Sequence, residues 1–305
     1  MKYFDLHCDT VGRCFDEKKP LKNNDFHISI EKANAFENYS QVFAIWLRDE
    51  LSNEEAYEYF LSARQNALNE FDKNKDIINL CSDVSAFSDK KSNAVFSVEN
   101  SKLLDNSLQR IDEIYALGVR LMTLTWNAEN CLASGVGSGS DDGLKPFGKQ
   151  AVRKMNEKKI AVDVSHLNDA GFYDVAKTAQ APFLASHSNA RSVCGHARNL
   201  TDDMIKIISS NGGIIGLNLS VNFLSDDGKA GLSDILAHVN YILDIGGEEV
   251  LALGADYDGT DVPIELSTFD KIPILYDFLS KNGLGKSLCD KIFYKNAFNY
   301  FTNRL

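Results

Sequence analysis

Short apolar runs of strand length recur along the chain, and stretches of helical length separate them. A parallel sheet built from strand and helix units produces this alternation, because strands that are covered on both faces are almost continuously apolar. Eight such runs occur, at residues 3–6, 41–47, 94–98, 120–125, 160–164, 182–185, 213–219 and 250–254. The pattern predicts an α/β fold, a single (β/α)₈ TIM-type barrel that spans residues 1–305.

Helix signals fill the intervals between these runs. Residues 103–117 end at Gly118, and glycine commonly follows the last residue of a helix. Thr201 is followed by two aspartates, which is the composition of a helix N-cap and first turn. Further helices are predicted at residues 53–71, 149–158, 169–178, 202–210, 233–245 and 276–279.

Polar side chains stand at the carboxyl ends of several predicted strands. They are His7 and Asp9, Glu99, His166, His187 and Asp256. In a parallel barrel these ends meet at one face, so we expect the side chains to converge there. Imidazole and carboxylate ligands without thiolates favour zinc, and less often manganese or iron, while a bridging carboxylate allows two ions. Cys8 points away from His7 and Asp9 in this interpretation and serves packing.

Composition and charge narrow the range of partners. The formal net charge of −11 argues against nucleic-acid and anionic-membrane partners, because both require a basic surface. Six cysteines are scattered without a CxxC motif, which is typical of reduced intracellular proteins. The sequence shows neither a signal peptide nor a membrane anchor. We therefore expect a cytoplasmic protein.

Six segments together resemble the membrane (renal) dipeptidase family of zinc metallopeptidases, which belongs to the amidohydrolase-like superfamily. They are DLHCDT, SVEN, LTWNAEN, VDVSHL, SHSNARSVCGHARN and LGADYDG, and the similarity extends over nearly the whole chain. The resemblance implies a centre of two zinc ions. His7 and Asp9 would bind one ion, His166 and His187 would bind the other, and Glu99 would bridge them.

The resemblance also implies a reaction, which is hydrolysis of dipeptides with a free C-terminal carboxylate. Arg198 matches the arginine that holds this carboxylate, and Asp256 matches the aspartate that shuttles the proton. Two cations lower the pKa of a shared water, so hydroxide is available as the nucleophile near neutral pH. Bacterial relatives extend the expected substrates to dipeptides with a C-terminal D-residue. Family barrels are often dimeric, so a homodimer is a further expectation.

Two positions depart from the family pattern. Trp126 stands where the family typically has a histidine that contacts the substrate carbonyl, and an indole can donate a hydrogen bond but cannot carry positive charge. Ser220 stands where the mammalian enzymes have a tyrosine near the substrate. Both predict an altered pocket, with Trp126 as a substrate contact. Arg191 and His196 are interpreted as loop scaffolding, with His196 also a weaker candidate for substrate contact.

Two alternative functions stay open. The first is another amidohydrolase-type reaction, such as deamination or lactone opening. Enzymes of that kind usually carry His-x-His on the first strand, whereas this chain has His7 and Asp9 at those positions. The second is a metal-binding barrel that has lost catalysis, which Trp126 motivates.

Overall fold

A curled parallel sheet forms the centre of the protein in this computed structural model, which describes residues 1–88 and 90–303. Seven strands follow one another in the order β6-β5-β4-β2-β1-β8-β7, and β3 pairs with β4 beside this path. The strands are β1 (Lys2–Cys8), β2 (Asn38–Trp46), β3 (Ile78–Leu80), β4 (Ser92–Glu99), β5 (Val119–Thr123), β6 (Ala161–Asp163), β7 (Ile215–Leu217) and β8 (Leu251–Leu253).

The α/β class and seven of the eight predicted strands are confirmed. Residues 182–185 differ from the prediction, because they form isolated parallel bridges instead of a strand. Leu184 pairs with Asp163 of β6, and Ala185 pairs with Ile215 of β7. The segment thus lies between β6 and β7, where the predicted strand would be. It pairs with each neighbour through one residue only. Closure as a complete eight-stranded barrel stays a prediction.

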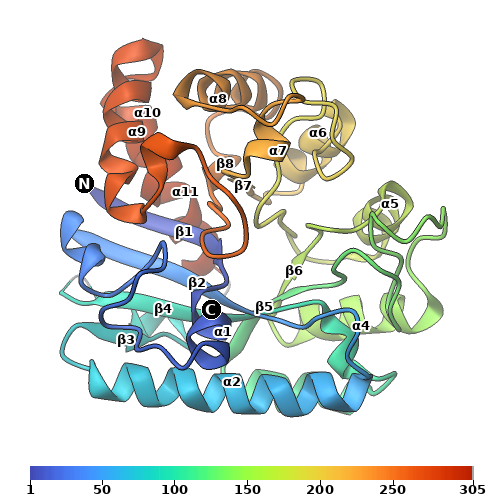
Figure 1. Ribbon diagram of the computed structural model, residues 1–305. Helices are drawn as coiled ribbons and strands as arrows, with labels where there is room; N and C mark the ends of the chain where they lie inside the picture. The colour runs from blue at the N-terminus through green and yellow to red at the C-terminus, as the bar shows by residue number, and fades with distance from the viewer. Residues whose placement is uncertain (89, 304–305) are drawn as a thin grey trace.

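Helices surround the outside of the sheet (Figure 1). The predicted caps hold, since Thr201 Oγ accepts a hydrogen bond from Met204 N at 3.3 Å and Gly118 has a φ of 92°. The helices are α1 (Thr10–Asp16), α2 (Asn53–Lys73), α3 (Leu108–Ala116), α4 (Pro146–Glu157), α5 (Asp169–Thr178), α6 (Asp202–Ser210), α7 (Val221–Leu224), α8 (Leu232–Gly246), α9 (Ile272–Leu279), α10 (Gly285–Asp290) and α11 (Asn296–Thr302). None of those in the described part of the chain combines the length and apolarity that crossing a membrane requires.

Some helix boundaries differ from the prediction for local reasons. The helix predicted at 103–117 starts only at Leu108, because Asp105 and Asn106 take left-handed φ values of 46° and 59° that interrupt it. The sequence pattern also missed α1, a seven-residue helix that begins directly after the first strand. This helix forms one end of the cavity at the strand ends.

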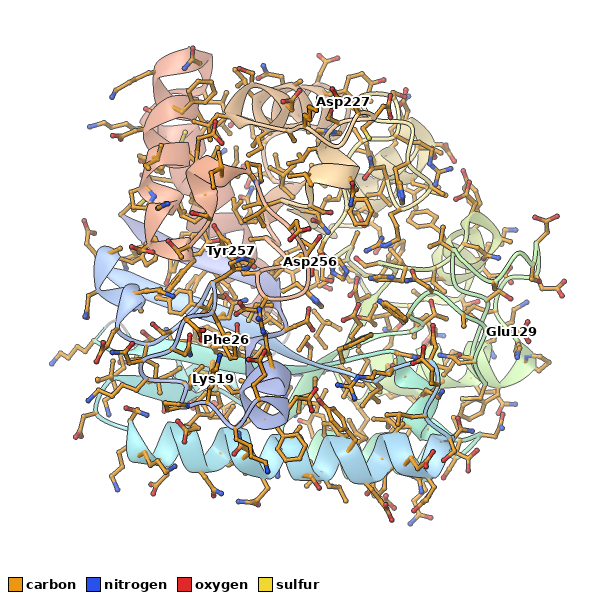
Figure 2. The ribbon with its side chains drawn as sticks, viewed as in Figure 1. Lys19, Phe26, Glu129, Asp227, Asp256 and Tyr257 are labelled. Atoms are coloured by element: carbon orange, nitrogen blue, oxygen red, sulfur yellow. The ribbon has the colours of Figure 1, made fainter. Side chains whose placement is uncertain are left out.

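Apolar side chains pack on both faces of the sheet. Phe4 and Leu6 belong to the smaller of two core clusters, together with Phe301 of α11, whose ring stacks on Phe4 at 5.4 Å. Cys8 belongs to the larger cluster, as predicted for a thiol that serves packing. Asp256 and Tyr257, which directly follow β8, lie near the centre of the molecule (Figure 2). Apolar packing on both faces of the sheet thus holds in place the strands that lead to the cavity.

Three backbone segments meet closely at the carbonyl of Ser186. A Cβ at Gly254 would lie 1.8 Å from Ser186 O, and one at Gly216 would lie 1.9 Å from the same atom. The Ser186 carbonyl oxygen could not avoid such a Cβ unless the backbone around it also moved. Glycine is therefore required where β7 and β8 approach the residue that precedes His187.

We predict that Gly254→Ala lowers the free energy of unfolding by about 1–3 kcal/mol, because the added methyl group overpacks this contact. Urea titration followed by circular dichroism measures the effect. Gly195→Ala is the matched control, since its Cβ would meet nothing closer than Asp226 Oδ1 at 3.8 Å. An equal change in both variants would contradict the explanation.

Candidate active site

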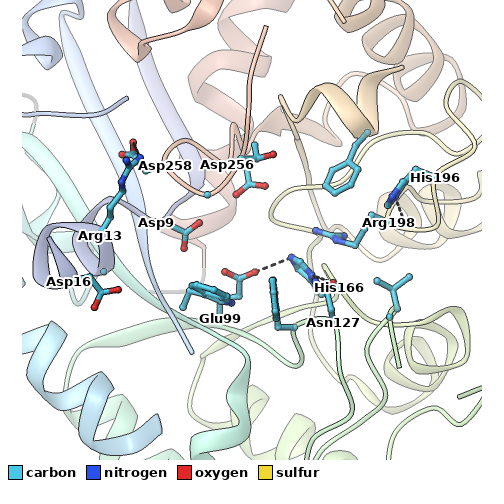
Figure 3. A pocket seen from close by; sticks show the side chains of 18 of the residues that line it. Asp9, Arg13, Asp16, Glu99, Asn127, His166, His196, Arg198, Asp256 and Asp258 are labelled. Carbon is cyan, nitrogen blue, oxygen red and sulfur yellow. Dashed lines mark hydrogen bonds and ion pairs between the residues drawn. The ribbon is translucent and has the colours of Figure 1, made fainter. Parts of the chain in front are cut away.

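A cavity of about 800 Å³ lies at the carboxyl ends of the strands. Most of the predicted site residues line it: Asp9, Glu99, Trp126, His166, Arg198 and Asp256. His7 and His187 are fully buried behind these residues and contact Glu99. Figure 3 shows the carboxylates of Asp9, Glu99 and Asp256 around the middle of the cavity, with Glu99 paired to His166. The residues predicted to converge are therefore together.

Glu99 is the centre of this cluster, and its two oxygens face different histidines. Oε2 lies 3.5 Å from His7 Nε2, whereas Oε1 lies 2.9 Å from His166 Nε2 and 3.8 Å from His187 Nε2. Glu99 is the last residue of β4, and its side chain is almost completely buried. One carboxylate thus connects two sets of potential ligands.

Hydrogen bonds fix the tautomers of His166 and His187. His166 Nδ1 donates to Asn127 Oδ1 at 3.0 Å, and His187 Nδ1 donates to Ser186 Oγ at 2.7 Å, because that hydroxyl itself donates to Asp163 at 2.6 Å. Both Nε2 atoms then carry a lone pair, and they face each other at 2.9 Å. Two lone pairs at this distance repel unless a cation lies between the nitrogens and the neighbouring carboxylate. The arrangement fits a metal site.

The second ligand set surrounds His7. Its Nε2 lies 3.6 Å from Asp9 Oδ2 and 3.8 Å from Asp256 Oδ1. Neither ring nitrogen of His7 has a hydrogen-bond partner among the described residues, nor has Asp9 Oδ1. Buried polar atoms without partners are costly, and a bound cation would satisfy Asp9 Oδ1 and the unprotonated ring nitrogen of His7. The donor set also fits, since imidazole and carboxylate are ligands of divalent metals.

Asp9 reaches this position differently from the prediction. We expected His7 and Asp9 to share one side of a strand, but β1 ends at Cys8 and Asp9 is the N-cap residue of α1. The pairing of β1 with β2 also shifts register between Asp5 and Cys8. The two side chains meet because the chain turns there, and strand alternation alone does not bring them together.

The charges of the cluster shift the pKa values of its histidines in opposite directions. Burial disfavours the charged form of His7, but Glu99 and Asp9 outweigh it and raise the pKa of His7 well above its usual value. Burial and the nearby Arg198 lower the pKa of His166 to about 4, and burial together with His7 holds the pKa of His187 well below its usual value. Neutral imidazole is the form that binds metals, so two of the three histidines are ready to bind at neutral pH.

Asp256 differs from the other carboxylates of the site. Burial raises the pKa of Asp256 to about 7, and Asp9 adds to the rise. Its Oδ2 accepts a hydrogen bond from Asn218 Nδ2 at 3.0 Å, and its backbone has a left-handed φ of 61°. Gly259 makes room for it, because a Cβ there would lie 2.6 Å from Asp256 Oδ1. A carboxyl group with a pKa near neutrality can both accept and release a proton.

Arg198 lies buried at one end of the cavity. Its guanidinium lies over the ring of Phe223 at 5.4 Å and donates to the carbonyl of His187 at 3.3 Å. Its Nε is buried and has no hydrogen-bond partner among the described residues. A guanidinium with a free donor at a cavity wall is suited to a carboxylate.

Arg191 and His196, the other two basic residues of the loop that carries Arg198, have different surroundings. Arg191 forms a bidentate ion pair with Asp169 of α5 at 2.7 and 2.8 Å and donates to two backbone carbonyls of its own loop. It is loop scaffolding, as predicted. His196 lines the cavity beside Phe223, and its Nδ1 accepts a hydrogen bond from Arg198 N at 3.1 Å. This contact orients the backbone that carries Arg198.

The two positions that depart from the family pattern lie at different depths. Trp126 lines the cavity and packs edge-on against Trp46, with ring centroids 4.9 Å apart. Ser220 is buried behind the wall, and its hydroxyl accepts a hydrogen bond from Thr260 Oγ1 at 2.9 Å. Thr260, and not Ser220, is the residue of this pair that lines the cavity. The structure therefore brings Trp126 to the site and leaves Ser220 outside its surface.

Several supporting residues were missed from the sequence. Asp163 is fully buried and accepts hydrogen bonds from Ser186 and Thr123, so it anchors the hydroxyl that orients His187. Asp5 is also fully buried and accepts from the backbone of His7 and Ala255. Both stand inside apolar strand runs, and an acid at such a position is the signal that could have identified them.

The chain matches a known protein family in sequence. The family model described as membrane dipeptidase, peptidase family M19, matches residues 1–303. A relative from Klebsiella pneumoniae, an uncharacterized protein in the pqqA 5′ region, is 35% identical over 225 residues, which cover 70% of this chain and 83% of the relative.

Solved structures are similar over the whole chain. A metallopeptidase from Rhodobacter sphaeroides, liganded with a phosphinate mimic of the dipeptide L-Ala-D-Ala, has a TM-score of 0.93 at 25% identity and covers 100% of this chain and 99% of its own. The probable dipeptidase PvdM from Pseudomonas aeruginosa has a TM-score of 0.84 at 18% identity, covering 97% of this chain and 99% of its own, and so shares the fold.

The pKa of Asp256 leads to a prediction for metal-free protein. A carboxyl group whose folded-state pKa is raised stabilises the fold below its unfolded pKa, and this stability is lost as the pH rises toward about 7. We expect metal-free Asp256→Asn to be more stable than the wild type by about 1–4 kcal/mol near pH 8, and by much less near pH 4. Urea unfolding after treatment with a chelator measures both values.

Asp227 provides a control with the opposite sign. This exposed carboxylate accepts a hydrogen bond from Lys229 N, which lowers the pKa of Asp227. Asp227→Asn should therefore slightly destabilise the protein at neutral pH and lose that effect in acid. A gain in Asp256→Asn that does not change between acid and alkaline pH would contradict the assigned pKa.

Proposed function

The chain belongs to the membrane dipeptidase family, peptidase family M19, and we propose that it is a dizinc dipeptidase whose catalytic centre is the cluster around Glu99. Membership makes it a metallopeptidase, a hydrolase that uses a divalent metal. The observation that carries the proposal is the position of Glu99, whose Oε1 faces His166 and His187 while Oε2 faces His7. This is the arrangement that a bridging carboxylate requires.

In this proposal His7 and Asp9 hold one ion, and His166 and His187 hold the other. Bound zinc would supply Lewis acidity toward the scissile carbonyl and acidify the attacking water. Asp256 accepts the proton of that water at its Oδ1 and delivers it to the nitrogen of the leaving amine. Asn218 holds the other carboxylate oxygen and so keeps Oδ1 directed at the reacting atoms.

Arg198 defines the substrate class in this proposal. Its guanidinium lines the cavity and binds the free C-terminal carboxylate of a small peptide, so that the peptide bond lies beside the residues that would hold the metals. Arg198 and the cluster line the same cavity, and a site for a free C-terminal carboxylate favours dipeptides over longer chains. The Rhodobacter sphaeroides metallopeptidase binds a phosphinate mimic of L-Ala-D-Ala, which supports including dipeptides with a C-terminal D-residue.

The remaining expectations belong to the same proposal. We expect the sheet to close as an eight-stranded barrel through residues 182–185, and the protein to be cytoplasmic and to form a homodimer. Trp126 contacts the substrate near the scissile carbonyl. A barrel that binds metal without catalysis is the alternative hypothesis that the following assay tests.

We predict that Asp256→Asn lowers kcat for L,L- and L,D-dipeptides by about a hundredfold or more, because the proton carrier is lost. The assay uses zinc-loaded protein, with metal content determined by atomic absorption for both forms. Two zinc ions per chain should remain in the variant. Wild-type protein that binds two zinc ions tightly but hydrolyses no dipeptide would favour the inactive barrel.

We predict that Arg198→Met raises KM for free dipeptides by about ten- to a hundredfold, because a charge-assisted hydrogen bond is lost while the apolar packing on Phe223 remains. The comparison measures free dipeptides against dipeptide amides. Arg191→Met is the matched control, since Arg191 is paired with Asp169 and does not line the cavity. Equal effects on acids and amides would show that Arg198 has another role.

A further inference from the structure

The end of the cavity opposite Arg198 is widened by a glycine of α1, and we propose that it binds a bulky, uncharged, aromatic or long aliphatic side chain on the first residue of the dipeptide. The proposal rests on the function assigned above and concerns its substrate preference. It depends on Gly12, Trp46 and Tyr59, which line this end of the cavity.

The direction of the bound substrate follows from the order of groups along the cavity. Figure 3 shows Arg198 and His196 on one side of the carboxylate cluster, and Arg13 and Asp16 of α1 on the other side. With its carboxylate on Arg198 and its peptide bond at Glu99, a dipeptide must extend its first residue toward α1. The side chain of that residue is then received by the α1 end.

Two aromatic side chains, Trp46 and Tyr59, line the α1 end of the cavity beside the charged residues of α1. Trp46 packs against Trp126, with ring centroids 4.9 Å apart, and Tyr59 comes from α2, which packs against α1. The Arg48 guanidinium lies 5.8 Å from the Trp46 ring and 5.7 Å from the Tyr59 ring, so it joins the two rings. Aromatic walls favour apolar and aromatic ligand groups.

Two acids at this end, Asp16 and Glu17, are already paired. Asp16 accepts a hydrogen bond from Tyr59 Oη at 3.1 Å and forms an ion pair with Arg48. Glu17 pairs with Arg13 at 2.8 Å. The negative charge of each acid is therefore offset by a neighbouring arginine and does not favour a cationic ligand group.

The cationic group of Arg13 is engaged as well. It lies 3.7 Å from Asp258 Oδ1 and 4.3 Å from the ring of Phe26, and Phe26 lies beside Lys19 (Figure 2). With its cation and its acids paired among themselves, this end selects for an uncharged side chain. The preference for a bulky side chain comes from the space beside Gly12 and from apolar contact with Trp46 and Tyr59.

Gly12 creates the space, although the backbone does not require a glycine there. Its φ lies outside the left-handed region, and an added Cβ would meet only Tyr59 Oη, at 3.6 Å. Glycine inside a helix costs roughly 0.5–1 kcal/mol relative to alanine. The stability of α1 therefore does not explain Gly12, whereas the room it leaves in the cavity does.

The size of the cavity agrees with this assignment. Its volume of about 800 Å³ lies near the upper end of the roughly 300–1,000 Å³ found for pockets that hold drug-sized ligands. Two small residues would leave much of this space filled only by water. A large first residue would replace that water with contacts to Trp46 and Tyr59.

The test measures binding of two phosphinate dipeptide analogues to zinc-loaded protein, one with Phe and one with Ala as the first residue. Intrinsic tryptophan fluorescence is the readout, because the chain has two tryptophans, Trp46 and Trp126, and both line the cavity. We expect the Phe analogue to bind about tenfold tighter or better, as expected when a large apolar side chain is buried. Gly12→Leu should abolish this difference, and Gly12→Ala should reduce it.

Ala197→Leu is the matched control, because Ala197 lines the cavity beside Arg198 and the substitution adds comparable bulk at the opposite end. It should change the affinity for both analogues by the same factor. Thermal unfolding of each variant establishes that it is folded. If Gly12→Leu is unfolded, Gly12→Ala decides the outcome.

Equal affinity of the wild type for the two analogues would overturn the proposal, as would an equal loss of both in the Gly12 variants. In either case turnover of small dipeptides would leave the dipeptidase function intact. If neither analogue binds and no dipeptide of a panel with small and bulky first residues is hydrolysed, the proposed function fails and this inference fails with it.

Discussion

The cluster around Glu99 buries several ionisable groups together and leaves some of their ligand atoms without a hydrogen-bond partner among the described residues. Two imidazole lone pairs face each other at 2.9 Å, and both nitrogens of His7 lack a hydrogen-bond partner among the described residues. Such a cluster is stable only when cations are bound or when its protonation states adjust. The rest of the structure is organised to hold these groups in place despite that cost.

Hydrogen bonds one step away from the cluster provide the rigidity. Asp163 holds the Ser186 hydroxyl, which in turn orients His187, and Asn127 orients His166. The backbone is also constrained, because His166 and Asp256 both take left-handed φ values, of 69° and 61°. Such conformations cost energy in residues with side chains and persist where the surrounding structure enforces them. Here the enforcing elements are buried strands that end at the cavity.

The cavity is asymmetric in charge and shape. At one end, Nε of Arg198 has no hydrogen-bond partner among the described residues, whereas at the other end Arg13 pairs with Glu17 and Asp16 pairs with Arg48. In the function we propose, a substrate with one anionic terminus binds in only one direction. Selection at the Arg198 end would then depend on charge, and selection at the α1 end on contact with Trp46 and Tyr59. The two ends would act on different residues of a dipeptide.

The sequence by itself determined the α/β class, the positions of seven strands and the identity of the residues that gather at Glu99. These features follow from local apolar periodicity and from polar residues at strand ends, both of which can be seen within a few residues. Only the tertiary structure decided that Asp9 stands at the N-cap position of α1, that Ser220 lies behind Thr260, that Arg191 pairs with Asp169, and that Gly12 lines the cavity. Those outcomes depend on contacts between segments far apart in the chain, and local patterns contain no information about which segments meet.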